Sequence, residues 1–194
     1  MEENKKFTGN AEFKYPDGSN YQGEWKDGKK SGFGTMAFAN YDIYEGDWED
    51  DKMNGVGTYR FWDKKLDKFT SRYVGTFKDG ARNGAGRMVY PDRSEYHGMW
   101  QNNMRTGEGI RIFANGDCFH GLWKFDKIVR GVLALKNGDK YDGEFKDGLF
   151  EGYGKYFWKD GSWYEGTWKD GKPFNGKKLN MDGSFAEINE GGIE

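Results

Sequence analysis

The 194-residue chain carries 30 basic and 32 acidic residues, and the two signs are interspersed along the sequence without a basic block. This balance excludes the electrostatic footprint that a nucleic-acid-binding protein would show. Only 35% of the residues are hydrophobic, yet 18% are aromatic and 31 are glycine. Disordered chains are poor in aromatic residues, so this composition indicates many short strands and tight turns whose apolar area comes from rings.

Compartment signals are few. The single cysteine, Cys118, excludes an intramolecular disulfide framework and fits a reducing compartment. The first ten residues, MEENKKFTGN, lack the apolar stretch of a signal peptide. The longest aliphatic run, Val132 to Leu135, is far shorter than the ~20 residues that span a bilayer. We therefore expect a cytoplasmic protein.

The chain begins with a tail, residues 1–8, which is followed by half of a repeat. Residues 9–20 align with the second half of the unit that starts at Tyr21, with Phe13 and Tyr15 in the places of Met36 and Phe38. Ala11 stands where later units carry their second glycine. We expect this half-repeat to cap the first edge of the fold.

The stretch from Tyr21 to Phe38, YQGEWKDGKKSGFGTMAF, consists of two strand-like runs around a Lys-Asp-Gly turn. Successive side chains of a strand point to opposite faces, so each run places its aromatic and glycine positions on one face. The stretch is therefore predicted to form a β-hairpin with an aromatic side.

This unit repeats along the chain with a period close to 23 residues. The leading aromatic residues are Tyr21, Tyr44, Tyr73, Tyr96, Phe119, Tyr141 and Tyr164. A glycine follows two positions later in every unit, and a Trp or Phe two positions after that. We expect seven repeats over residues 21–185 and a polar C-terminal tail over residues 186–194. Glycine pairs such as Gly32 and Gly34 are interpreted as slots in which a ring lies against bare backbone.

Two segments depart from the period. The first is an insertion over residues 62–72, WDKKLDKFTSR. It is either a tolerated loop, because loop-closure cost grows slowly with length, or a protruding partner-specific finger with Leu66 and Phe69 at its tip. The second is repeat five, from Phe119 to Lys140, which loses one residue and its first glycine. That change predicts a local kink or altered packing, or else a partner-related surface.

The pattern Tyr-x-Gly-x-Trp-x-x-Gly-x-x-x-Gly-x-Gly resembles the MORN (membrane occupation and recognition nexus) repeat. YQGEWKDGKKSGFG at Tyr21 and YDGEFKDGLFEGYG at Tyr141 match it position by position, and the resemblance extends over about residues 9 to 185. It implies an all-β fold, in which stacked β-hairpins form one elongated antiparallel sheet that twists and curves. It also implies a scaffold or adaptor of cilia, cytoskeletal structures or membrane-contact sites. Some family members bind phospholipid, and others bind a peptide or helix along the aromatic groove.

No nucleotide, metalloenzyme or catalytic-triad motif occurs in the sequence. His97 and His120 occupy equivalent positions in successive repeats, which would place them about 9.6 Å apart, too far to share a metal ion. We therefore expect no enzyme activity, no cofactor and no metal site.

The remaining candidate is the aromatic face. Most of its rings should form the core, but a single sheet cannot fully bury one of its own faces, so some ring edges should line a partner-binding groove. The candidate partner-binding residues are Tyr21, Trp25, Tyr44, Trp48, Tyr73, Phe77, Tyr96, Trp100, Trp123, Tyr141, Phe145, Tyr164 and Trp168.

These observations predict a non-enzymatic scaffold or adaptor that binds a protein partner in a ciliary, axonemal or other cytoskeletal assembly. Two alternatives stay open. One is a peripheral phospholipid-binding module, against which the near-zero net charge argues because headgroup attraction needs clustered basic residues. The other is a targeting subunit of an enzyme complex.

Overall fold

The computed structural model describes residues 7–189 and 192–193, and every regular element in them is a β-strand. The predicted all-β fold of stacked antiparallel hairpins is confirmed. The chain divides into two compact units, residues 1–104 and 105–194, which are taken separately below. The N-terminal tail expected over residues 1–8 lies outside the described residues except for its last two positions.

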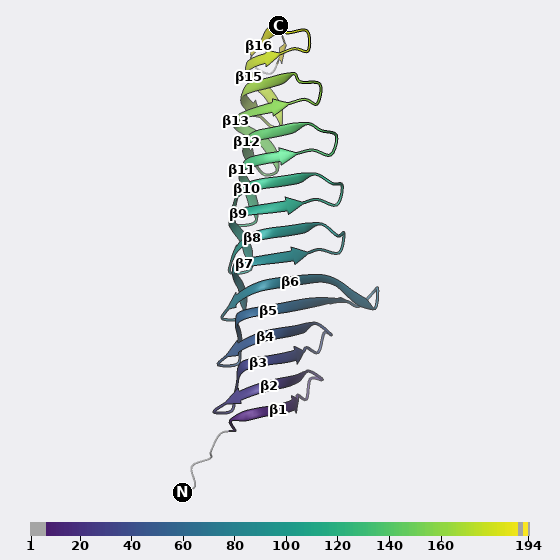
Figure 1. The fold of residues 1–194 in the computed structure, drawn as a ribbon, viewed down its shortest axis with the longest axis vertical. Helices are drawn as coiled ribbons and strands as arrows, with labels where there is room; N and C mark the ends of the chain where they lie inside the picture. The colour runs from purple at the N-terminus through teal and green to yellow at the C-terminus, as the bar shows by residue number, and fades with distance from the viewer. Residues whose placement is uncertain (1–6, 190–191, 194) are drawn as a thin grey trace. The chain divides into compact units, whose positions relative to one another are not determined.

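In the first unit, each strand pairs antiparallel with the strand before it in the sequence (Figure 1). Its strands are β1 (Gly9–Lys14), β2 (Asn20–Lys26), β3 (Lys29–Ala37), β4 (Ile43–Glu49), β5 (Lys52–Asp63), β6 (Lys68–Lys78), β7 (Ala81–Val89) and β8 (Glu95–Gln101). Strands β5 and β6 are longer than their neighbours, because the inserted residues continue their pairing.

The second unit follows the same scheme of consecutive antiparallel pairs. Its strands are β9 (Met104–Ile112), β10 (Cys118–Lys124), β11 (Lys127–Ala134), β12 (Lys140–Lys146), β13 (Leu149–Phe157), β14 (Trp163–Lys169), β15 (Lys172–Leu179), β16 (Phe185–Asn189) and β17 (Gly192–Ile193). Residues 186–189, expected to belong to a polar tail, form most of β16.

The turn that joins the two strands of each full repeat has two residues, and both have positive φ. Between β2 and β3, Lys26 pairs with Lys29, while Asp27 and Gly28 have φ of 51° and 78°. This geometry twists in the same sense as the flanking strands and favours Asp, Asn and Gly. The β10–β11 turn is unusual because Phe125 takes the first position, at a φ of 47°.

The two glycines of each pair have different reasons to be glycine. Gly32 has a φ of 64° and lies in a bulge, where the Glu24 carboxylate accepts a hydrogen bond from the Phe33 amide at 2.9 Å. A Cβ on Gly34 would stand 2.2 Å from the hydroxyl oxygen of Tyr21. The interpretation of these glycines as packing slots is therefore right for the second glycine, whereas the first is required by the backbone conformation.

The core of each unit is a ladder of rings that crosses the strands. Tyr21 is completely buried, and its hydroxyl donates a hydrogen bond to the Glu24 carbonyl oxygen at 3.0 Å. Its ring meets Trp25 of the same repeat at 5.2 Å and Trp48 of the next repeat at 5.3 Å, both edge-to-face. Because a leading ring such as Tyr21 or Tyr44 contacts two repeats, the ladder holds neighbouring hairpins together.

In β16 a small residue and a large one exchange places. Ala186 takes the position of a leading tyrosine, opposite Lys178, and Ile188 takes the following glycine position, opposite Gly176. Ile188 is buried, with 4% of its surface exposed. Isoleucine fits at the glycine position because residue 186 is alanine, so no tyrosine hydroxyl of β16 has to lie there. The exchange therefore ends the ladder while its last rings stay covered.

Replacing Gly57 by alanine should test the packing role of the second glycine. Its φ is unexceptional, but a Cβ would stand 2.4 Å from the Tyr44 ring, so Gly57→Ala should lower the free energy of unfolding by about 2–3 kcal/mol. The control is Gly148→Ala, where a Cβ meets open space and only the φ of 85° opposes it, at a cost of about 1 kcal/mol. Urea unfolding followed by tryptophan fluorescence measures both; an equal or smaller effect at Gly57 would contradict the packing role.

Candidate partner-binding site

The structure buries nearly all of the aromatic residues that the sequence suggested as partner contacts. Those with less than one tenth of their surface exposed are Tyr21, Tyr44, Trp48, Tyr73, Phe77, Tyr96, Trp100, Trp123, Tyr141, Phe145, Tyr164 and Trp168. Trp25 alone in the predicted set is half-buried. The surface that a partner can touch is therefore built mainly from other side chains.

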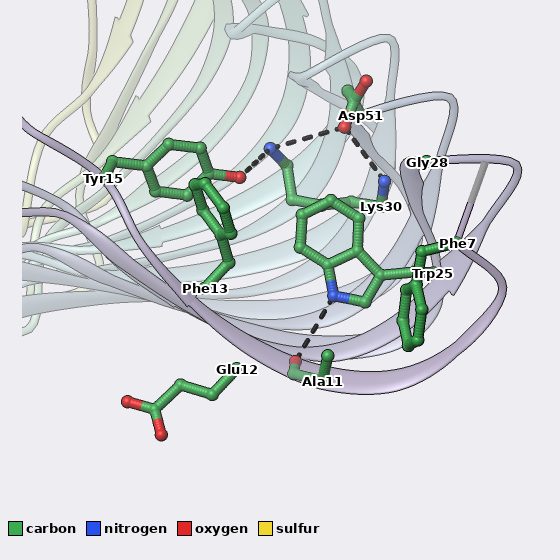
Figure 2. Close-up of a pocket in the computed structure, with 9 residues that line it drawn as sticks. All are labelled: Phe7, Ala11, Glu12, Phe13, Tyr15, Trp25, Gly28, Lys30 and Asp51. Atoms are coloured by element: carbon green, nitrogen blue, oxygen red, sulfur yellow. Dashed lines mark hydrogen bonds and ion pairs between the residues drawn. The ribbon is translucent and has the colours of Figure 1, made fainter. Parts of the chain in front are cut away.

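Trp25 keeps exposed area because, among the residues that the structure describes, no repeat before its own supplies a leading tyrosine. Trp48 lies between the rings of Tyr21 and Tyr44, at 5.3 and 5.2 Å, whereas Trp25 has a leading tyrosine on one side only. On its other side there is a hollow of about 610 Å³. Figure 2 shows the residues that line it: Phe7, Ala11, Glu12, Phe13, Tyr15, Trp25, Gly28, Lys30 and Asp51.

Ala11 determines the shape of the hollow floor. The indole Nε1 of Trp25 donates to the Ala11 carbonyl oxygen at 3.3 Å, as Trp48 does to Gly34 at 3.1 Å, so Ala11 occupies the position of a second glycine. A Cβ at Gly34 would collide with the Tyr21 ring. The methyl group of Ala11 therefore excludes a tyrosine in the pose seen elsewhere in the ladder, and leaves room for a shorter apolar side chain.

Lys30 forms the polar wall of the hollow. Its Nζ lies 5.2 Å from the centroid of Tyr15 and 5.7 Å from that of Tyr21, at cation–π distance. The same Nζ is 3.2 Å from the Tyr15 hydroxyl oxygen and 3.5 Å from the Asp51 carboxylate. The lysine thus covers the rings with its stem; the side chain is largely buried, and its ammonium group is paired with Asp51.

The type of residue that packs over the ring ladder correlates with the residue at the second position of the next hairpin turn. A cation there accompanies Asp or Asn in that turn, as in the pairs Lys30–Asp51, Arg82–Asn103 and Arg105–Asp126. An apolar residue accompanies glycine, whose amide donates to its carbonyl oxygen, as in the pairs Phe7–Gly28, Met53–Gly80 and Phe150–Gly171. The residues of each pair are in the sequence, but their correlation can be recognised only once the register of the strands is known.

A second hollow repeats the first at the equivalent place two repeats later. It has a volume of about 220 Å³ and is lined by Met53, Tyr59, Phe61, Phe77, Gly80, Arg82 and Asn103. Both hollows adjoin a turn glycine, Gly28 or Gly80, where no side chain fills the space. These hollows could not be predicted from the turn sequences, because Gly, Asn and Asp all suit the same backbone conformation there.

The insertion folds as an ordered extension of the β5–β6 hairpin. Asp63 pairs with Lys68, and its carboxylate closes the tip by accepting hydrogen bonds from the amides of Lys65 and Leu66 at 2.8 and 3.0 Å. Leu66 and Phe69 are 58% and 40% exposed. A role of these two side chains in partner choice stays a prediction.

His97 takes part in a polar contact at the surface. His97 Nε2 lies 2.7 Å from Glu95, and Arg87 donates to the same carboxylate at 2.8 Å. These hydrogen bonds, with Arg87 contributing most, lower the pKa of Glu95. Among the described residues, no group of three or more His, Cys, Asp or Glu side chains is placed to hold a metal ion. The same residues include no helix with the length and apolar character needed to cross a membrane.

The repeat model of one protein family matches the chain. The MORN repeat is found at residues 21–43, 44–61, 73–95, 96–118, 141–163 and 164–174, which together make up more than half of the sequence. The chain therefore belongs to the MORN-repeat family. The model leaves residues 119–140 unmatched, which is the segment of the irregular fifth repeat. A comparison with curated proteins finds no match.

Comparison with solved structures finds TCP domains at low identity. The TCP10 domain of Danio rerio CPAP is 10% identical, with 95% of this chain and 97% of that domain covered and a TM-score of 0.36. The SAS-4 (dCPAP) TCP domain of Drosophila melanogaster, solved with a proline-rich motif of Ana2 (dSTIL), is 12% identical, with coverages of 93% and 90% and a TM-score of 0.35. Likenesses at this level carry no information on function.

Burial should make the ladder tyrosines resist ionisation. Desolvation raises the pKa of both Tyr21 and Tyr73 from 10.0 to about 12. Between these pH values the unfolded chain loses protons that the folded chain keeps, so the free energy of unfolding should fall as pH rises through this window. Phenolate absorbance during alkaline titration measures it, with tryptophan fluorescence reporting folding. Ionisation of all tyrosines near pH 10 in the folded chain would contradict the burial.

The matching of Lys30 with Asp51 should appear as an energetic coupling. Lys30→Met and Asp51→Gly each break the pair, whereas the double variant recreates the Met53–Gly80 arrangement. We expect a coupling of about 0.5–1 kcal/mol from a double-mutant cycle measured by urea unfolding. Strictly additive effects would show that the two positions are independent.

Proposed function

We propose that this MORN-repeat protein is a non-enzymatic scaffold that binds a protein partner at the hollow beside Trp25. The observation that carries the proposal is the unfinished end of the ring ladder. Phe7 and Phe13 are 51% and 49% exposed there, whereas the residues equivalent to Phe13 in later repeats are buried, as at Met36 and Met88, or half-buried, as at Tyr59 and Tyr156. Exposed aromatic patches with a polar rim are typical of protein interaction sites.

The occupant is an extended segment of the partner. Among the described residues β1 pairs only with β2, so the other edge of β1 offers backbone groups to an added strand. In the register that successive hairpins follow, such a strand would place a side chain over Ala11 and against Trp25. The Ala11 methyl group favours an aliphatic residue such as leucine or methionine at that place.

The broader setting of the proposal comes from the family. MORN-repeat proteins are recurrently scaffolds of cilia and cytoskeletal structures, so a ciliary or other cytoskeletal assembly is the setting we propose for the partner. Imaging of the tagged chain in ciliated cells addresses that setting separately from the binding site. The net charge of −2 gives no support to a phospholipid as the main ligand.

A photo-crosslinking residue in place of Phe13 should capture the partner, and one in place of Phe33 should not. Phe33 is 53% exposed and lies in β3, on the other face from the ladder, so it is a matched control. The captured protein, once purified, should bind Phe13→Glu about tenfold more weakly or worse, and Phe33→Glu with unchanged affinity. Equal binding by Phe13→Glu, or capture from Phe33 alone, would contradict the proposed site.

A further inference from the structure

The extended β5–β6 ribbon carries a second, separate surface on its outer face. Arg60 stands directly opposite Arg72, and Trp62 stands opposite Phe69. Arg60 and Trp62 alternate onto the same side of β5, and a bulge in which Thr70 is the extra residue of β6 keeps Arg72 and Phe69 opposite them. The two cross-strand pairs are therefore neighbours on one face. An arginine pair therefore adjoins an aromatic pair at the base of the insertion.

The aromatic part of this surface is held by ring contacts and a hydrogen bond, and two of its rings are exposed. Trp62 contacts Phe69 at 4.9 Å and Tyr41 at 6.1 Å between ring centroids, and its amide donates to the Asp42 carboxylate at 2.7 Å. Tyr41 is 61% exposed and Phe69 is 40% exposed. A held but uncovered cluster of rings offers contact area at little cost in conformational entropy.

The loops on either side of the ribbon contain backbone strain that other loops avoid. Tyr41 and Arg93 have φ of 71° and 67°. Glycine takes the equivalent position in the loops that contain Gly18, Gly116, Gly138, Gly161 and Gly183. A tyrosine or arginine in this conformation is less stable than glycine, so some other role must favour these two side chains beside the insertion.

The charge of the ribbon is positive. Residues 60–72 contain Arg60, Lys64, Lys65, Lys68 and Arg72 against Asp63 and Asp67, in a chain whose net charge is −2. Arg60 is partly compensated by Glu45 at 3.4 Å, whereas Arg72 is exposed. Two like charges directly across a sheet repel each other, and a ligand carboxylate between them would remove that repulsion.

We propose that the Arg60–Arg72 and Trp62–Phe69 face binds an acidic segment of a partner protein that carries an aromatic or aliphatic side chain. The carboxylate pairs with Arg72 and Arg60, and the apolar side chain packs on Trp62 and Phe69. This surface is independent of the hollow beside Trp25 and does not rest on it.

Selection of a random peptide library on the purified full chain tests this assignment. Peptides that compete with one another should be enriched in Asp or Glu beside an aromatic or aliphatic residue, and their binding should weaken with added salt. For the best synthetic peptide, Arg72→Glu and Phe69→Ser should each weaken binding by about tenfold or more.

Two matched controls separate this surface from general charge and hydrophobicity. Arg130 is another exposed strand arginine, and Phe33 is another exposed strand phenylalanine, so Arg130→Glu and Phe33→Ser should leave the affinity unchanged. Selection of no acidic peptide, or equal loss with the controls, would overturn the proposal. A third outcome would also overturn it. In that outcome the chain binds no peptide but sediments with vesicles of phosphatidylcholine and phosphatidylserine, and Arg72→Glu abolishes the sedimentation.

Discussion

The structure depends on one steric constraint, the contact of a tyrosine ring with bare backbone. Tyr21 is fully buried because Gly34 has no Cβ, and the same relation recurs at Tyr44 with Gly57 and at Tyr141 with Gly154. With the ring seated there, its hydroxyl can satisfy a carbonyl oxygen of its own strand, and its edges can meet the indoles of two repeats. Low aliphatic content is then no obstacle, because each repeat obtains its core from rings.

A ladder that depends on neighbours must end somewhere, and the two recognisable ends differ. In β16, Ala186 and Ile188 exchange sizes relative to a normal repeat, and the isoleucine is buried. At β1 no comparable exchange occurs, and Trp25 faces a hollow lined by Phe7 and Phe13. The proposed partner segment would supply there the neighbour that every later indole already has.

Much of the fold could be predicted from the sequence because its signals are local and repeated. The period of the leading aromatic residues fixed the hairpins, and the Asp, Asn and Gly turns fixed their connections. Most of the rings on the aromatic face were expected to form the core and are buried, but which ring keeps exposed area could not be predicted, because all of them share the same periodicity. The hollows depend on which cross-strand neighbour lacks a side chain, as at Gly28 and Gly80, and this requires the register. Only part of the ribbon face could be predicted. Leu66 and Phe69 stand out in the insertion, whereas the pairing of Arg60 with Arg72 could not be predicted from the sequence.

Amide hydrogen exchange of the chain with and without its crosslinked partner tests the central claim most directly. If the open end of the ladder is the binding site, the partner should add protection to the amides of β1 and to the backbone around Trp25. The amides of β3 and β4 next to Tyr44 should be unaffected, because their rings are already covered. Protection spread evenly over the repeats, with none gained in β1, would contradict the account.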